Sequence, residues 1–157
     1  MTRLFRYILV SDTGMAPCTD HCLVTLATCK PDIRRNAQLG DLGRRISPDA
    51  APTRSPRLCW TCRQNLEVGT YERTHRGRSD AVYRDSVDGT FERVRPDYHA
   101  QPDEIRKDLS ASVLIFDKAA TWYFGDRPRA LPENLSHLAA AGRGYRVNGP
   151  SAKDIVA

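Results

Sequence analysis

The sequence predicts a single α+β domain, spanning residues 1–157, with a mixed or antiparallel curled sheet and short helices. Its length of 157 residues suits one domain. Short runs of aromatic and β-branched residues recur along the chain, separated by Gly, Pro and Asp, which is typical of strands joined by loops. Segments with helical signals are few and short, so we expect helices to accompany a sheet rather than to form a bundle.

The first third of the chain predicts a strand, a loop and a short helix. Aromatic and aliphatic residues over Leu4–Ser11 favour a strand, and Asp, Gly and Pro over Asp12–Pro17 end it. The segment Cys29–Ala37 has Pro at the first turn of an expected helix. The next segment, Leu42–Pro56, holds three Pro and three Arg with little periodicity, and we expect an irregular loop there.

The rest of the chain predicts further short elements. An Asp-Gly pair at Asp88-Gly89 indicates a hairpin turn, and the apolar run Ser112–Phe116 favours a central strand. The other expected elements are strands at Leu58–Arg63, Leu66–Tyr71 and Thr121–Phe124, a helical turn at Ile105–Leu109 and a helix at Pro132–Ala141.

The composition excludes some classes of protein. No apolar run approaches the ~20 residues of a membrane span, and charges interrupt the apolar N-terminal stretch, so we expect neither a membrane protein nor a signal peptide. The formal net charge is +5, and Arg supplies 20 of the 24 basic residues. A GC-rich genome would explain the Arg excess, and so would an anionic partner, since Arg pairs well with phosphate.

Five cysteines in a chain without an export signal favour a reducing, cytoplasmic setting. Cys18, Cys22, Cys59 and Cys62 have the paired spacing of a four-cysteine zinc site. Cys22 and Cys29 nevertheless lie among apolar residues, where cysteine usually packs as a small hydrophobe. We therefore expect no metal site and no cofactor.

Candidate site residues gather in three segments. A short helix bearing Lys30, Arg34 and Arg35 could hold a phosphate. His99 is the best candidate for a general acid or base among the four histidines, because Tyr98 and a carboxylate adjoin it. Aromatic side chains near loops could stack on a base, and the candidates are Tyr98, Trp122 and Tyr123.

Several motifs together resemble one known family. They are Tyr7–Pro17, Cys22–Pro31, Ile33–Arg35, Gly40-Asp41, Asp80–Arg84, Val113–Phe116, Tyr123–Gly125 and Gly142–Gly144. This pattern resembles the nucleotide modification associated domain 2 family over nearly the whole chain. The resemblance implies a context, namely proteins that work beside enzymes making or handling modified nucleotides in DNA. The order of elements is also similar to PUA and EVE domains, which hold a base in a curled sheet.

The sequence departs from the family at Leu42–Pro56, where the family has an aromatic and apolar strand. A compensated shift of reading frame in the gene would produce such a stretch and would damage a central strand. The family also continues into a final helix, so we expect the C-terminal helix to be truncated here.

The resemblance leads to three hypotheses. The first is a protein that binds a nucleotide, or DNA with modified bases, where Arg143 joins the phosphate-binding cations and Asp12 and Thr13 read the polar edges of the base. The second is an enzyme at the same site, a transferase or hydrolase, with Asp12 or His99 as the acid or base. The third is an interaction module with a vestigial site. The sequence does not decide between them, nor does it name the base, the modification or the oligomeric state.

Overall fold

The computed structural model describes residues 3–8, 15–46, 56–123, 133 and 146–148. The strands are β1 (Leu4–Ile8), β2 (Thr25–Leu26), β3 (Leu42–Ile46), β4 (Pro56–Leu66), β5 (Tyr83–Asp85), β6 (Phe91–Arg93), β7 (Val113–Phe116), β8 (Trp122–Tyr123) and β9 (Arg146–Asn148). The helices are α1 (Pro31–Asn36), α2 (Val68–Thr74) and α3 (Pro102–Leu109), with short 3-10 turns η1 (Asp20–Cys22) and η2 (Lys118–Ala120). Within these residues, no helix has the length and apolar character to cross a membrane.

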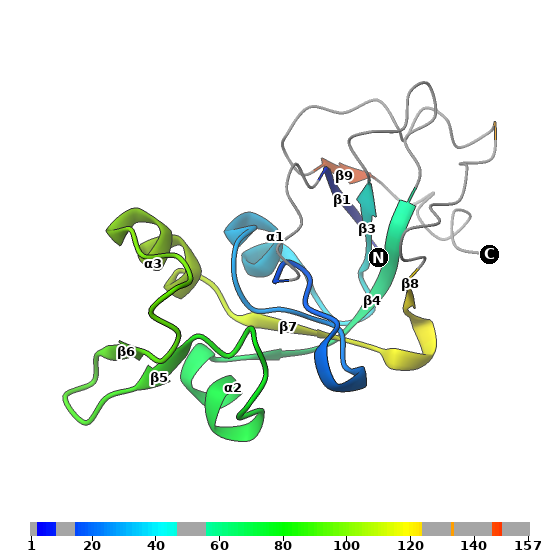
Figure 1. Cartoon of the computed structure of the whole chain (residues 1–157). Helices are drawn as coiled ribbons and strands as arrows, with labels where there is room; N and C mark the ends of the chain where they lie inside the picture. Colours follow the sequence, from blue (N-terminus) through cyan, green and yellow to red (C-terminus); the bar gives the residue numbers. More distant parts are fainter. Residues whose placement is uncertain (1–2, 9–14, 47–55, 124–132, 134–145, 149–157) are drawn as a thin grey trace.

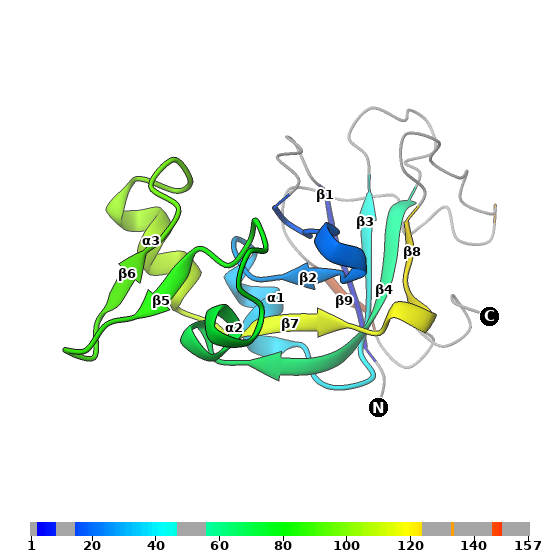
Figure 2. The ribbon, with the colours of Figure 1, turned by 60° about the horizontal axis from the view of Figure 1, so that its bottom comes forward.

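A mixed sheet organises the fold (Figure 1). Its strand order is β2-β7-β4-β3-β1-β9, and β8 also pairs with β4. The β1–β3 pair is parallel, whereas the other pairs in this sheet are antiparallel. A separate two-stranded sheet, β5-β6, lies beside α3 at one end of the molecule, as Figures 1 and 2 show. The predicted α+β class and mixed sheet are confirmed; the likeness to PUA and EVE domains stays a prediction.

The long strand β4 joins two halves of this sheet. It pairs with β3 through Pro56 to Thr61, and with β7 through Cys62 to Leu66. The register against β7 shifts between Cys62 and Gln64, which is typical of a β-bulge. A bulge bends the strand that contains it, and β4 turns from one half of the sheet into the other in Figure 2.

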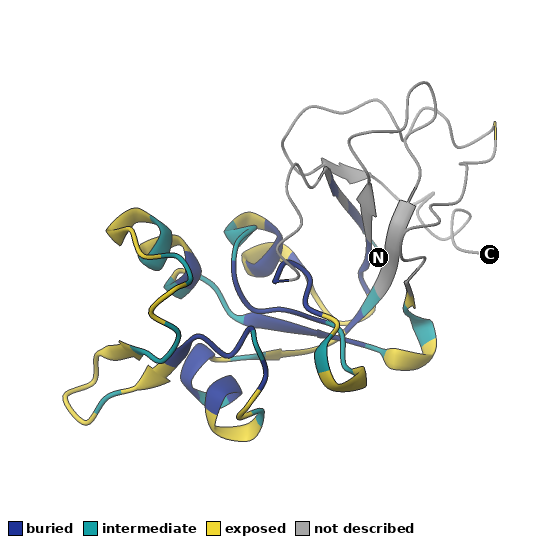
Figure 3. Ribbon diagram, in the orientation of Figure 1, coloured by how far each residue is buried: buried dark blue, intermediate teal, exposed yellow. Residues whose placement is uncertain are grey.

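The central strand β7 separates two buried clusters. Its four residues are all buried (Figure 3). Leu114 and Phe116 belong to the cluster on the side of α1, whereas Val113 and Ile115 belong to the cluster on the side of α2. Successive side chains of a strand point to opposite faces, so one apolar run supplies both clusters. This is the central strand that the sequence predicts at Ser112–Phe116.

Two sequence predictions about elements are wrong. Leu42–Ile46 is a strand, β3, rather than part of an irregular loop, because β1 and β4 pair with it on both sides. The predicted strand Leu66–Tyr71 gives way to helix α2, which places Val68 and Tyr71 together in a buried cluster. The predicted helix at Pro132–Ala141 lies outside the described residues except for Glu133.

Arg34 fastens α1 to the segment between α3 and β7. Its side chain is 1% exposed. The guanidinium donates to the backbone carbonyls of Ser112 at 2.9 Å, Asp108 at 2.7 Å and Cys29 at 3.4 Å, and also to that of Ala111. Burial lowers the pKa of Arg34 to about 10, and the charge of Asp108 opposes this shift. The residue therefore has a structural role that its sequence context does not reveal.

We expect Arg34→Ala to lower the free energy of unfolding by about 3 kcal/mol or more, because it leaves buried carbonyls without a donor. Arg35→Ala is the matched control, since Arg35 is exposed and pairs with Asp32 at the surface. Its removal should change stability by no more than about 1 kcal/mol. Urea denaturation of both variants measures the difference, and equal losses would contradict the structural role of Arg34.

Candidate functional site

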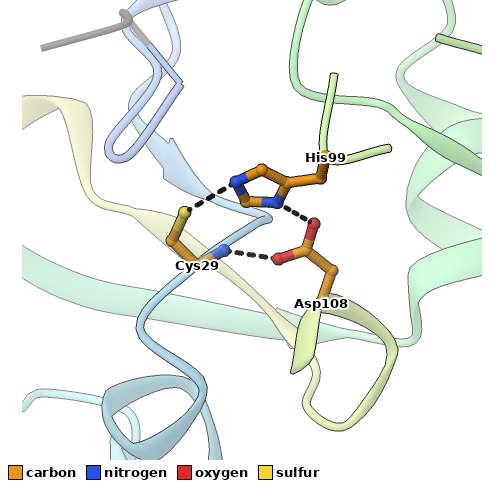
Figure 4. Close-up of side chains that lie close together, drawn as sticks. All are labelled: Cys29, His99 and Asp108. Carbon is orange, nitrogen blue, oxygen red and sulfur yellow. Dashed lines mark hydrogen bonds and ion pairs between the residues drawn. The ribbon is translucent and has the colours of Figure 1, made fainter. Parts of the chain in front are cut away.

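Three chemically reactive side chains meet between α1 and α3. Cys29 precedes α1, His99 follows the β5-β6 sheet, and Asp108 lies in the last turn of α3. Cys29 is 70 residues from His99 and 79 from Asp108, so the fold alone brings them together. Figure 4 shows the side chains of His99 and Asp108 pointing toward each other and Cys29 beside both.

The contacts form a chain from sulfur to carboxylate. Cys29 Sγ lies 3.5 Å from His99 Nε2, and His99 Nδ1 lies 2.6 Å from Asp108 Oδ2 (Figure 4). A carboxylate only accepts hydrogen bonds, so Nδ1 carries the ring proton. When the imidazole is neutral, Nε2 is then the atom that can accept the proton of the Cys29 thiol. A nucleophile, a base and a group that orients the base in this order are typical of covalent catalysis.

The Asp108 carboxylate is held on several sides. It is 1% exposed. Oδ1 accepts the backbone N–H of Cys29 at 2.7 Å, and Oδ2 accepts the Tyr83 hydroxyl at 3.0 Å in addition to His99. Burial first, and then the charge of Asp108, raise the pKa of Tyr83 well above its usual range, so this hydroxyl stays a donor. The orientation of His99 is therefore set by a carboxylate that cannot turn freely.

Tyr98 completes the surroundings of the thiol. Its ring stacks on that of His99, with centroids 4.0 Å apart and planes 20° apart. Its hydroxyl lies 3.2 Å from Thr28 Oγ1 and 3.5 Å from Cys29 Sγ. Burial raises the pKa of Tyr98 well above its usual range. The sequence predicts that Tyr98 stacks on a base, and in this structure it stacks on the predicted acid or base, His99.

The backbone at the site is strained. Cys29, Lys30 and His99 have φ angles of 56°, 42° and 47°, in the left-handed region that residues with a side chain rarely adopt. Each such residue costs about 1–2 kcal/mol relative to ordinary backbone. Strained residues of this kind cluster at functional sites. Two other residues with a side chain, His21 and Cys22 in η1, have the same left-handed backbone, so this conformation is not confined to the site.

The surroundings of Cys29 favour the protonated thiol over the thiolate. Burial raises the pKa of Cys29 above its usual value, and the charge of Asp108 adds to this effect. The Tyr98 hydroxyl and the cations Lys30 and Arg34 act in the opposite direction and only moderate it. Formation of the thiolate therefore needs a proton acceptor within reach, and His99 Nε2 is placed as one.

The predicted phosphate-binding cations lie in different environments. Lys30 adjoins Cys29 and places its ammonium 5.1 Å from the centre of the Tyr7 ring; burial lowers its pKa. Arg35 is exposed and paired with Asp32 at 2.5 Å. Arg34 is buried, and its guanidinium donates to backbone carbonyls. The prediction that Arg34 contacts a phosphate is therefore wrong. The sequence prediction failed because the sequence of a short helix does not show which of its cations is exposed and which is buried.

The structure does not place the other predicted site residues beside Cys29, His99 and Asp108 in the part of the chain that it describes. Trp122 is 47% exposed on β8, which pairs with β4 at the end of the sheet opposite α3 (Figures 1 and 2). Tyr123 also belongs to β8, but its side chain is not described. Asp12, Thr13 and Arg143 lie outside the described residues.

Sequence reasoning missed Cys29 and Asp108 as functional candidates. Cys29 was expected to pack as a small hydrophobe. Asp108 stands among exposed charged residues of α3, where a solvated carboxylate is the simplest expectation. One signal could have identified it: an acidic residue in the last turn of a helix is unfavourable next to the helix dipole, and such a position calls for a compensating partner.

Cys29, His99 and Asp108 are also the one possible metal-binding group within the part of the chain that the structure describes. Their ligand atoms lie within 4.8 Å of one another. Cys18 and Cys62, of the four-cysteine set considered above, have other contacts: Cys18 Sγ lies 3.3 Å from Ser79 Oγ, and Cys62 Sγ donates to Asn65 Oδ1 at 3.4 Å.

One comparison with known proteins agrees with the sequence interpretation. The family model of nucleotide modification associated domain 2 matches residues 1–60 and confirms the predicted resemblance in this part of the chain. The match runs through residues 42–56, where we expected a departure from the family. It includes Cys29 and Lys30, whereas His99 and Asp108 lie beyond it. Neither the curated proteins nor the solved structures showed a significant match.

We expect thiol-reactive reagents to distinguish the cysteines of this site and its surroundings. At pH 7, iodoacetamide should label exposed Cys22 much faster than Cys29, whose thiol is partly buried and protonated. Labelling of Cys29 should then accelerate about tenfold for each pH unit below its pKa, as the thiolate fraction grows. Peptide mass spectrometry over a pH series follows both residues, and fast, pH-independent labelling of Cys29 would contradict this description.

Proposed function

We propose that the protein binds and chemically processes a nucleotide, free or in DNA, with Cys29 as the nucleophile. The observation that carries this proposal is the contact chain from Cys29 Sγ through His99 to Asp108. The family match supports the nucleotide context, because the matched family is described as associated with nucleotide modification. The reaction class is group transfer or hydrolysis at an electrophilic atom of the nucleotide.

The proposed chemistry has two stages, and His99 carries the proton in both. His99 Nε2 takes the proton of the Cys29 thiol, and the sulfur attacks the electrophilic atom of the substrate. The bond to the leaving group breaks, its electron pair departs with the leaving group, and the His99 imidazolium returns the proton there. Water then attacks the adduct, with His99 again as the base, and releases the thiol. Asp108 stabilises the imidazolium and keeps the Nδ1 proton in place.

Substrate binding is proposed to involve Lys30 and Tyr98. Lys30 follows Cys29 directly in the chain, so its cation is the nearest candidate partner for a phosphate. Tyr98 is partly exposed beside the thiol and offers an aromatic ring near the reacting sulfur. Arg93 supports this arrangement, since it donates to the backbone carbonyls of Tyr98 at 3.3 Å and His99 at 2.8 Å.

Turnover of a panel of ordinary and modified nucleotides and oligonucleotides tests the catalytic role. We expect Cys29→Ala to abolish turnover. His99→Ala should lower kcat by roughly 10²–10⁴-fold, because a general base supplies that much. Cys22→Ser is the matched control, since Cys22 is exposed and outside the contact chain, and it should keep full activity.

Each opposing result has a definite meaning. Turnover that survives Cys29→Ala would overturn the role of Cys29 as the nucleophile. Nucleotide binding by the native protein, measured by calorimetry, without turnover of any panel member would reduce the proposal to a binding function. That outcome would agree with the protonated state of the resting thiol.

Lys30→Ala tests the phosphate contact separately. Binding of a single-stranded oligonucleotide should weaken, and the slope of log K against log salt concentration should become less steep by about one. The matched control is Lys118→Ala, an exposed lysine on η2 away from Cys29, which should leave both quantities unchanged. Fluorescence anisotropy over a salt series measures them, and equal effects of the two variants would exclude a specific contact by Lys30.

A further inference from the structure

We propose that Cys29 and His99 bind a zinc ion reversibly, with Asp108 as the outer partner of His99, and that this ion blocks the nucleophile. The binding stands on the geometry of the three residues. Its regulatory consequence rests on the proposed function, because only a catalytic thiol can be inhibited in this way. The composition led us to expect no metal, and this site differs from the four-cysteine set considered there.

The separation of the two ligand atoms fits zinc. A tetrahedral zinc ion lies about 2.3 Å from a thiolate sulfur and about 2.0–2.1 Å from an imidazole nitrogen, which places the two ligand atoms about 3.5 Å apart. Cys29 Sγ and His99 Nε2 are 3.5 Å apart. The distance between the two atoms therefore fits a zinc ion that both of them bind.

The hydrogen bond on the far side of His99 supports the same conclusion. Metal-binding histidines usually donate the other ring N–H to a carboxylate, which fixes the ring and raises its basicity. His99 Nδ1 makes this bond to Asp108 at 2.6 Å and leaves the Nε2 lone pair available. Asp108 is in turn held by the backbone N–H of Cys29 and by Tyr83, so ligand and outer partner are already in place.

The number of ligands indicates reversible binding. Structural zinc sites in proteins use four side chains and catalytic sites use three, whereas Cys29 and His99 supply two here. Water or a substrate atom would fill the other positions. Lys30 and Arg34 also place positive charge near the thiol, which disfavours a further cation. We therefore infer an exchangeable ion rather than a permanent part of the fold.

The proton balance gives a further expectation. Zinc binds the thiolate, so the Cys29 thiol releases one proton to solvent as the sulfur–zinc bond forms. Affinity should therefore rise with pH. The ion also occupies the Nε2 lone pair that would accept the thiol proton, so nucleophile and base are blocked together.

Cobalt and zinc titrations of the full chain test this inference. Co²⁺ should produce a thiolate-to-cobalt charge-transfer band that Zn²⁺ removes by competition. Cys29→Ser should abolish the band, and Asp108→Asn should lower affinity about 10–100-fold through the loss of the outer partner. His99→Gln provides a second ligand variant if Asp108→Asn does not fold, and it should also abolish binding. Cys22→Ser is the control and should retain both the band and the affinity.

Protection of Cys29 supplies a readout that does not depend on activity. Zinc should slow the alkylation of Cys29 by about tenfold or more when the ion is in excess. Cys22 should react at the same rate with and without zinc. A native protein with no charge-transfer band and no protection of Cys29, or a band that persists in Cys29→Ser, would overturn the inference.

The two proposals fail in different ways. If Cys29-dependent turnover exists but neither band nor protection appears, the zinc inference is wrong and the proposed function stands. If the band depends on Cys29 and His99 but no nucleotide is turned over, the site binds metal and the role of Cys29 as a nucleophile is wrong. If both hold, zinc should inhibit turnover at the concentration that protects Cys29.

Discussion

The buried carboxylate of Asp108 is the interaction on which the site depends. It joins the turn before α1 through Cys29, the small β5-β6 sheet through Tyr83, and the loop after that sheet through His99. A buried charge is stable only where enough donors surround it. Those donors come from three separate parts of the chain, so the carboxylate that orients His99 also holds together the segments that present the thiol. The fold around the site and the proposed chemistry therefore depend on the same buried carboxylate, that of Asp108.

The opposite charge at this junction belongs to Arg34. Its guanidinium lies beneath α1, near Asp108, and donates to carbonyls around the end of α3. This cation fixes the position of α1, whereas Lys30 places its ammonium over the Tyr7 ring. Left-handed backbone at Cys29, Lys30 and His99 is tolerated because these surrounding contacts determine it. The same rigidity would present sulfur and imidazole to a substrate or to a metal ion.

Much of the fold could be predicted from the sequence where local and tertiary preferences agree. The apolar run of β7, the Asp-Gly hairpin and the Pro-initiated helix α1 are such cases. The predictions failed where tertiary contacts override local preference. β3 forms from an Arg-containing segment because it pairs with a strand on each side, and α2 is helical although its Val, Thr and Tyr residues favour strands. At Gly69 of α2, a Cβ atom would collide with the Asp85 carboxylate of β5, so another residue there would require the exposed Asp85 side chain to move.

The sequence by itself determined the α+β class, the nucleotide-related family resemblance and His99 as the candidate base, because these depend on composition, motifs and near neighbours. Only the tertiary structure decided that Cys29 faces His99, that Asp108 orients it, and that Arg34 is structural. The physical reason is separation along the chain. Cys29 and Asp108 are 79 residues apart, and no local pattern predicts a contact between the turn before α1 and the last turn of α3.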